Sequence, residues 1–118
     1  MHEQIETIES GYEYLLAYAA QGKDTDASGS GAASEVRTRL TAMAEAAVSI
    51  SSTLEGDNST FGWVILDDAK KAHAAISLVL EQKGISSEMV DNLNASIHLR
   101  ALLTDLFLLS EARPRAPS

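Results

Sequence analysis

A helical spacing of apolar residues is the feature of this sequence that most constrains its fold. Between positions 36 and 54, apolar residues recur at intervals of four, three, four, three and four: Val36, Leu40, Met43, Ala47, Ile50 and Leu54. Because an α-helix has about 3.6 residues per turn, these side chains share one face of a helix, whereas a strand would scatter them. We therefore expect a helix that starts after Ser34, a suitable N-cap, and buries this face against other helices.

Three further segments have the length and apolar spacing of helices: residues 2–21, 61–83 and 86–113. They are followed by Gly22, Gly84 and Pro114, residues that favour the end of a helix. The turns before the third and fourth helical segments are short, roughly four or five residues, which favours antiparallel neighbours. The prediction is an all-α fold, an antiparallel up-and-down four-helix bundle in a single domain of residues 1–113.

A glycine-rich segment, the C-terminal tail and one glycine inside a helix depart from this helical pattern. Residues 22–33 are rich in Gly, Ser and Asp, which predicts a flexible linker, and residues 114–118 predict a disordered tail. Gly11 lies inside the first helical segment, where glycine costs about 1 kcal/mol relative to alanine. A close approach by a neighbouring helix would account for it.

The last helical segment carries apolar residues on two faces. One stripe is Val90, Leu93, Ile97, Ala101, Thr104 and Leu108, and the second is Leu99, Leu102, Leu103, Leu106 and Leu109. A helix with two apolar faces must bury both of them against protein. A single bundle buries one face and leaves the other exposed to water. We therefore predict a homodimer, or a larger even oligomer, with the second stripe as its interface. The alternative is a bundle skewed enough to bury both stripes by itself.

A polar ridge accompanies these leucines. Asp91, Asn94, His98 and Asp105 share a flank of the same predicted helix. Across a two-fold interface, antiparallel copies would bring His98 near Asp91 or Asp105 of the partner, a polar contact that sets the register. Simple exposure to solvent is the alternative for these three residues.

Charge and composition exclude several classes of function. Nine Lys and Arg residues stand against 17 Asp and Glu residues, a net charge of −8 that repels nucleic acid and anionic membranes. No apolar run approaches the ~18 residues of a membrane span. The chain has no cysteine, and its first 22 residues lack Lys and Arg, unlike the basic leader of a signal peptide. We expect a cytoplasmic protein.

The spacing of polar residues offers little chemistry. A di-metal site in a helical bundle needs Glu-x-x-His pairs, and the sequence contains none. Glu6, Glu9 and Glu13 share a helical face that is typical of a solvated surface. There is no Gly-x-Ser-x-Gly elbow for a nucleophilic serine. We predict no catalytic residues, no metal site and no cofactor.

His73 borders the inward face of the third helical segment, preceded by Ala72. A bundle of this size with a histidine in mid-helix resembles a histidine-phosphotransfer domain, in which an exposed imidazole accepts phosphate. The resemblance implies His73 as phosphoacceptor. The chain departs from that family at positions 76 and 77, which hold Ile and Ser instead of a Lys-Gly pair. The alternative is a histidine at the edge of the core with one side in water.

These observations favour a small interaction protein. We predict an adaptor or accessory subunit that presents helix surfaces to a second copy or another protein, without catalysis of its own. Trp63, off the inward face near a helix start, is a candidate contact residue. The alternative is a ligand- or metal-binding bundle, or a phosphotransfer-like module that uses His73.

Overall fold

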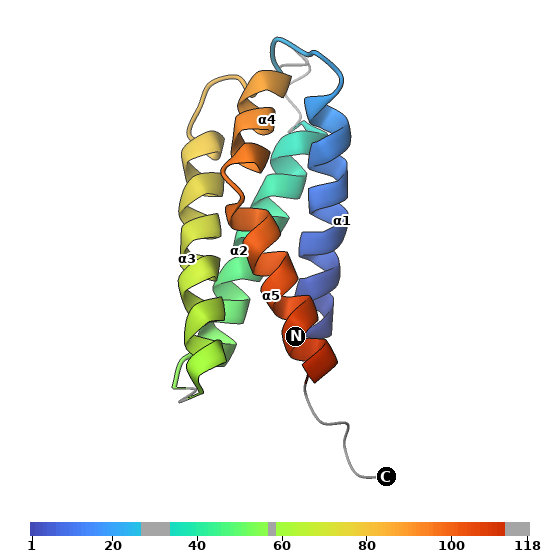
Figure 1. Cartoon of the computed structure of the whole chain (residues 1–118). Helices are drawn as coiled ribbons and strands as arrows, with labels where there is room; N and C mark the ends of the chain where they lie inside the picture. Colours follow the sequence, from blue (N-terminus) through green and yellow to red (C-terminus); the bar gives the residue numbers. More distant parts are fainter. Residues whose placement is uncertain (27–33, 57–58, 113–118) are drawn as a thin grey trace.

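The computed structural model describes residues 1–26, 34–56 and 59–112, which form five α-helices and no strand (Figure 1). The helices are α1 (His2–Ala19), α2 (Glu35–Leu54), α3 (Thr60–Leu80), α4 (Ser87–Ala95) and α5 (His98–Ala112). The all-α prediction is confirmed for these residues. The predicted tail, residues 114–118, and residues 27–33 of the predicted linker lie outside the described residues.

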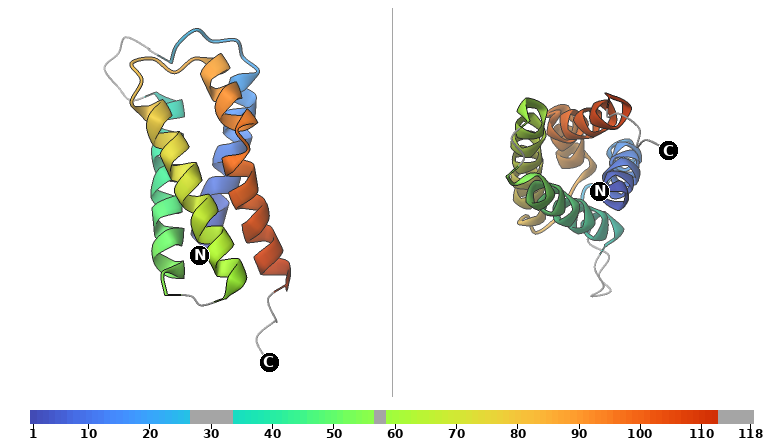
Figure 2. Two further views of the ribbon diagram at one scale, coloured as in Figure 1. Left: turned by 60° about the vertical axis from the view of Figure 1, so that its left-hand side comes forward. Right: turned by 90° about the horizontal axis from the view of Figure 1, so that it is seen from below.

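The helices surround a common interior. α2 packs against both α1 and α3, while α4 and α5 each contact α1 and α3 from the other side (Figure 2). The end of α1, the end of α3 and the start of α4 lie at one end of the molecule (Figure 1). Met1 and the end of α5 lie at the opposite end.

The apolar stripe of α2 lies in the core. All six of its residues are buried, as are five of the residues predicted to face inward on α3: Ile65, Ala69, Ala72, Ile76 and Val79. Burying a large aliphatic side chain of this kind stabilises the fold by about 1.5–3 kcal/mol. The two helices are therefore held together chiefly by side chains whose spacing was visible in the sequence.

Serine side chains begin three of the helices. Ser34, Ser59 and Ser86 precede α2, α3 and α4, and each hydroxyl accepts a hydrogen bond from the backbone N–H three residues later, at 3.3, 3.0 and 3.0 Å. Each bond satisfies one of the N–H groups that the first turn of a helix leaves without a partner. The caps explain why the helix starts agree closely with the sequence prediction.

Gly11 marks the close contact between α1 and α2. A Cβ atom at this position would lie 2.6 Å from Cγ of Met43, a side chain that is fully buried. Only glycine leaves room for this thioether in its present position. The expectation that a neighbouring helix approaches Gly11 closely is confirmed.

The predicted fourth helix is two helices, so the single helix over residues 86–113 is wrong. α4 ends at Ala95, and Ile97 adopts a left-handed backbone conformation with φ of 64°. The Ser96 hydroxyl donates to the carbonyl of Leu93 at 2.6 Å and so helps to end α4. A left-handed conformation costs an L-residue about 1–2 kcal/mol, and Ile97 is β-branched.

The position of the leucines explains this break. Leu93 and Leu99 are six residues apart, which in a continuous helix would separate them by about 120° around the axis. The left-handed residue rotates the chain so that α4 and α5 both turn their leucines inward. Burial of Leu99, Leu102, Leu103 and Leu106 outweighs the backbone strain, because each is worth about 1.5–3 kcal/mol.

A polar network, the Asp26 clamp, joins the loop after α1 to the end of α3. The Asp26 carboxylate accepts hydrogen bonds from Ser34 Oγ at 2.6 Å, Arg37 Nε at 2.8 Å and the backbone N–H of Ile85 at 2.7 Å. The Arg37 guanidinium also donates to the carbonyls of Leu80, Gln82 and Lys83. This part of the segment predicted as a flexible linker holds a carboxylate that is only 4% exposed.

A second set of hydrogen bonds ties α1 to the start of α4. The Tyr18 hydroxyl donates to the carbonyl of Ile85 at 2.6 Å, and the Ser87 hydroxyl donates to the carbonyl of Tyr18 at 2.7 Å. The backbone N–H of Lys23 donates to Ser87 Oγ, and the Ser87 N–H donates to the Lys23 carbonyl, both at 2.8 Å. These contacts join residues more than 60 positions apart and fix α4 against α1.

Candidate functional site

The leucines predicted to form a dimer interface lie inside the single chain. Leu99, Leu102, Leu103 and Leu106 are buried, and Leu109 is half-buried against the same core. The second stripe is therefore the inward face of α5. The reason for the difference is the break at Ile97, which lets one chain cover the leucines of both α4 and α5.

Part of the first stripe stays on the surface instead. Val90 and Leu93 are buried, while Ile97 is 57% exposed and Leu108 is 55% exposed. Phe107, next to Leu108, is also exposed. Trp63 on α3 is 70% exposed, so its side chain is available for contact, as the sequence suggested.

The structure places Asp91, His98 and Asp105 of the predicted polar ridge in separate surroundings, and their contact across a two-fold interface stays a prediction. Asp91 on α4 lines a shallow groove with α1, and Asp105 on α5 faces Asp68 of α3. His98 is the first residue of α5 and is half-buried. The break between α4 and α5 is the cause, because it rotates one helix relative to the other.

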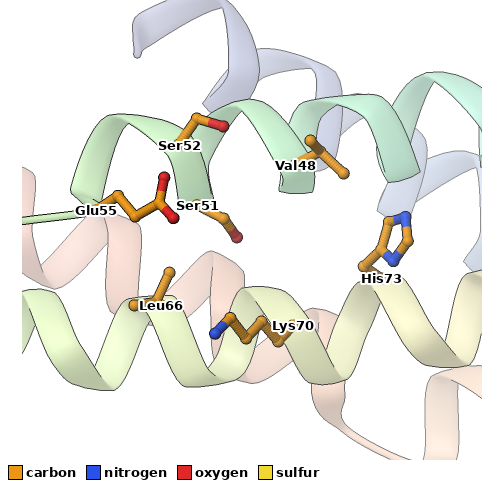
Figure 3. A pocket seen from close by; sticks show the side chains of 7 residues that line it. All are labelled: Val48, Ser51, Ser52, Glu55, Leu66, Lys70 and His73. Atoms are coloured by element: carbon orange, nitrogen blue, oxygen red, sulfur yellow. The ribbon is translucent and has the colours of Figure 1, made fainter.

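His73 lies at one end of a pocket of about 300 Å³ between α2 and α3 (Figure 3). The pocket is lined by Val48, Ser51 and Ser52 of α2, by Glu55 just after that helix, and by Leu66, Lys70 and His73 of α3. The Lys70 ammonium points away from the imidazole, toward Leu66 and the end of the pocket where Glu55 lies (Figure 3).

This arrangement offers limited support for phosphate chemistry. His73 is half-buried, and the Lys70 charge is not directed at it (Figure 3). A phosphoryl group on the imidazole would need a nearby cation to offset its charge. The prediction that His73 accepts phosphate stays untested, and the pocket gives it no positioned partner.

A second groove, the α3/α4 groove, is mostly apolar. It has a volume of about 350 Å³ and lies between the C-terminal half of α3 and α4. Its apolar walls are formed by Ala75, Leu78, Val79, Met89 and Leu93, and three polar side chains complete it. Leu78 is 61% exposed, and Ile97 follows Ser96 at the end of the groove. The α3/α4 groove can therefore receive apolar side chains of another molecule.

Sequence reasoning did not identify this groove. Leu78 follows the inward residue Ile76 by two positions and so lies off the core face of α3. An exposed leucine of this kind is a weak signal, because single apolar residues are common on protein surfaces. The groove joins residues of α3 to residues of α4, a pairing that residue spacing along one helix does not reveal.

The described residues show neither a metal-binding cluster nor a membrane-spanning helix. Among the described residues, no group of three or more His, Cys, Asp and Glu side chains is arranged to hold a metal ion. None of the helices in the described ranges combines the length and the apolar character that a membrane span requires.

Comparison with known proteins gave no match to a family model, to a curated protein or to a solved structure.

Proposed function

We propose that this protein is a non-catalytic interaction module that binds an amphipathic helix of another protein, with a basic polar face, in the α3/α4 groove. The observation that carries the proposal is the groove itself, an apolar surface bordered by the exposed side chain of Leu78. Contact sites combine an apolar centre with a polar rim, and Gln82, Asn92 and Ser96 border the apolar walls of this groove. A groove between two helices suits a third helix, which places apolar residues at positions i, i+3, i+4 and i+7 along it.

The charge of the chain supports a basic partner. The net charge is −8, and Glu81 and Glu88 are exposed close in sequence to groove residues of α3 and α4. Attraction between this surface and a cationic helix would speed association and favour it over an acidic one. The apolar face of the partner would then supply the binding energy within the groove.

A pair of synthetic peptides tests this proposal. One peptide carries leucine on its apolar face and lysine on its polar face, and the other replaces every lysine with glutamate. We expect the lysine peptide to shift amide resonances of residues 75–82 and of α4, with binding that weakens as salt is added. Shifts confined to other helices, equal binding of both peptides, or no binding of either would overturn the proposal.

Matched substitutions locate the binding site. Leu78→Glu places a charge in the groove and should abolish binding of the lysine peptide. Leu16→Glu alters a leucine of α1 that is 49% exposed and should leave binding unchanged. If both variants lose binding equally, the α3/α4 groove is not the docking site.

Self-association is a second candidate, in which the partner is another copy of this chain. Its support is the exposed apolar surface that remains on α5, where Phe107 and Leu108 are adjacent. Light scattering at tens of micromolar should then show a dimer that Leu108→Glu converts to a monomer. A monomeric wild-type chain would contradict this candidate and leave the groove proposal intact.

We infer that the chain is an up-and-down four-helix bundle whose fourth member is broken into α4 and α5. The supporting observation is that α4 and α5 both pack against α1 and α3, across from α2. We further propose a cytoplasmic location, which the lack of cysteine supports.

A further inference from the structure

The α4 wall of the α3/α4 groove is fastened to α1 and to the loop that follows α1. The Ser87 hydroxyl donates a hydrogen bond to the carbonyl of Tyr18 at 2.7 Å, and the backbone N–H of Lys23 donates to Ser87 Oγ at 2.8 Å. Ser87 is the first residue of α4 and is only 3% exposed. The start of α4 is therefore positioned by α1.

The α3 wall is held from α2 instead. The Arg37 guanidinium donates through Nη1 to the carbonyl of Leu80 at 3.1 Å. Through Nη2 it donates to the carbonyls of Gln82 and Lys83, at 2.7 and 3.0 Å. Leu80 is the last residue of α3, and Gln82 lines the groove. Carbonyls at the end of a helix lack partners within the helix, so Arg37 fixes the end of α3.

Asp26 joins these two supports. Its Oδ2 accepts the Nε–H of Arg37 at 2.8 Å, and its Oδ1 accepts the backbone N–H of Ile85 at 2.7 Å. Ile85 immediately precedes Ser86, the N-cap of α4. Because the carboxylate is 4% exposed and the arginine side chain 25% exposed, salt screens this ion pair less than a pair on the surface. One carboxylate thus contacts both the start of α4 and the side chain that holds the end of α3.

We propose that the Asp26–Arg37 pair sets the distance between the two walls of the α3/α4 groove and so tunes the groove for a partner helix. The effect on binding rests on the function proposed above, whereas the distance between the walls does not. Asp26 and Arg37 are positioning residues, since neither lines the groove. A small displacement of one wall would weaken contact with an inserted side chain, because dispersion attraction falls steeply with separation.

Arg37→Lys tests the geometry of the pair while keeping its charge. Lysine retains a positive charge for Asp26, but its single ammonium cannot match the planar fork of donors with which the guanidinium contacts a carboxylate and three carbonyls. Arg39→Lys is the matched control. It makes the same substitution two residues further along α2, at an arginine whose ion pair with Glu35, at 3.4 Å, lies on the surface.

A distance measurement between two spin labels tests the spacing of the walls without any ligand. The chain has no cysteine, so Ala74→Cys on α3 and Asp91→Cys on α4 supply two labelling sites, both exposed and neither lining the groove. We expect one narrow distance distribution, which Arg37→Lys shifts or broadens and Arg39→Lys leaves unchanged. A general loss of stability would not alter distances within folded molecules. An unchanged distribution in Arg37→Lys would overturn the proposal.

Titration with the lysine peptide described above tests the consequence for binding. We expect Arg37→Lys to bind this peptide about tenfold more weakly than the wild type, a usual size for coupling between separate sites. Arg39→Lys should bind it as the wild type does. If the label distances change in Arg37→Lys but the peptide binds equally well, the pair does not tune the groove and the proposal is wrong. If the wild type binds no peptide, the proposed function fails, while the label distances still decide whether the pair spaces the walls.

Discussion

Asp26 and Asp105 both turn a carboxylate toward the interior, yet their surroundings are opposite. Asp26 accepts hydrogen bonds from a hydroxyl, a guanidinium and a backbone N–H. Asp105 faces a second carboxylate and leaves one oxygen without a donor. The comparison shows that the donors around a buried carboxylate, and not burial alone, decide which protonation state stabilises the fold.

The two groups therefore respond to pH in opposite directions. Burial by itself would raise the pKa of Asp26, but the hydrogen bonds from Ser34, Ile85 and Arg37 lower it below its ordinary value. Ionised Asp26 stabilises the fold fully above the pKa that this carboxyl has in the unfolded chain. That stabilisation is lost as pH falls through the lower pKa that the carboxyl has in the folded chain. For Asp105 the stabilisation is lost as pH rises.

Arg37→Ala should have the largest effect, because it removes the only guanidinium of the Asp26 clamp and three hydrogen bonds to the end of α3. Leaving a buried charge without its partner costs about 3 kcal/mol or more. Urea unfolding at pH 7 would measure this loss. Arg39→Ala is the control, since its ion pair with Glu35 is an i,i+4 contact on the surface of α2, worth under about 1 kcal/mol. Equal losses in the two variants would contradict the central role of the clamp.

Asp26→Asn should destabilise the fold by about 2 kcal/mol at pH 7, since hydrogen bonds to a charged group are stronger than those to a neutral amide. The penalty should shrink as pH falls below about 4, because Asp26 of the unfolded wild-type chain then takes up a proton and the folded chain follows at lower pH. Urea unfolding at pH 7 and pH 3 gives the comparison. A penalty of the same size at both values would show that the charge of Asp26 contributes nothing.

Asp68→Asn should act in the opposite sense. At pH 8 it removes a like charge from Asp105 and should raise stability by about 1 kcal/mol, a value reduced by solvent screening. At pH 5.5 the gain should be smaller, because Asp105, whose pKa is raised to about 7, is then mostly protonated. The double variant Asp68→Asn with Asp105→Asn should gain less than the sum of the single changes, since both remove the same repulsion. A stability loss at pH 8 would contradict the assigned repulsion.

Ile97→Gly should have the smallest effect, a gain of about 0.5 kcal/mol. Glycine relieves the strain of the left-handed conformation but loses more freedom on folding, so the two effects largely cancel. Thermal unfolding would measure the shift. A loss above about 1 kcal/mol would show that the exposed Ile97 side chain makes a stabilising contact that its exposure does not suggest.

The sequence predicted the helices well because their signals are local. The stripe from Val36 to Leu54 needs only the helical repeat, and a serine cap needs only the N–H group three residues away. The contact at Gly11 was also foreseeable, since an unfavourable glycine inside a helix needs a reason. The stripe and the caps depend on residues of a single helix, whereas at Gly11 the glycine itself is the signal for a contact with another helix.

The break at Ile97 could not be predicted in the same way. Residues 95–98 are Ala-Ser-Ile-His, with no Gly or Pro to interrupt the helix. The cause is tertiary, because only the positions of α1 and α3 decide that Leu93 and Leu99 must face the same interior. Missing this break turned an inward face of leucines into a predicted dimer interface.

Candidate site residues were the least predictable part of the chain. Trp63 could be identified as exposed from its position off the stripe of α3. The α3/α4 groove, the Asp26 clamp and the Asp68–Asp105 pair each join residues from different helices or loops. Such pairings depend on how helices are rotated against one another, which residue spacing along a single helix does not encode.

Met1 and the end of α5 lie far from the α3/α4 groove, at the other end of the molecule (Figure 1). A protein immobilised on a sensor surface through either position would hold the groove away from the support and open to the solution. Attachment at Lys83, beside the end of α3, would crowd the groove instead. The direction of tethering would therefore decide how readily a partner is captured.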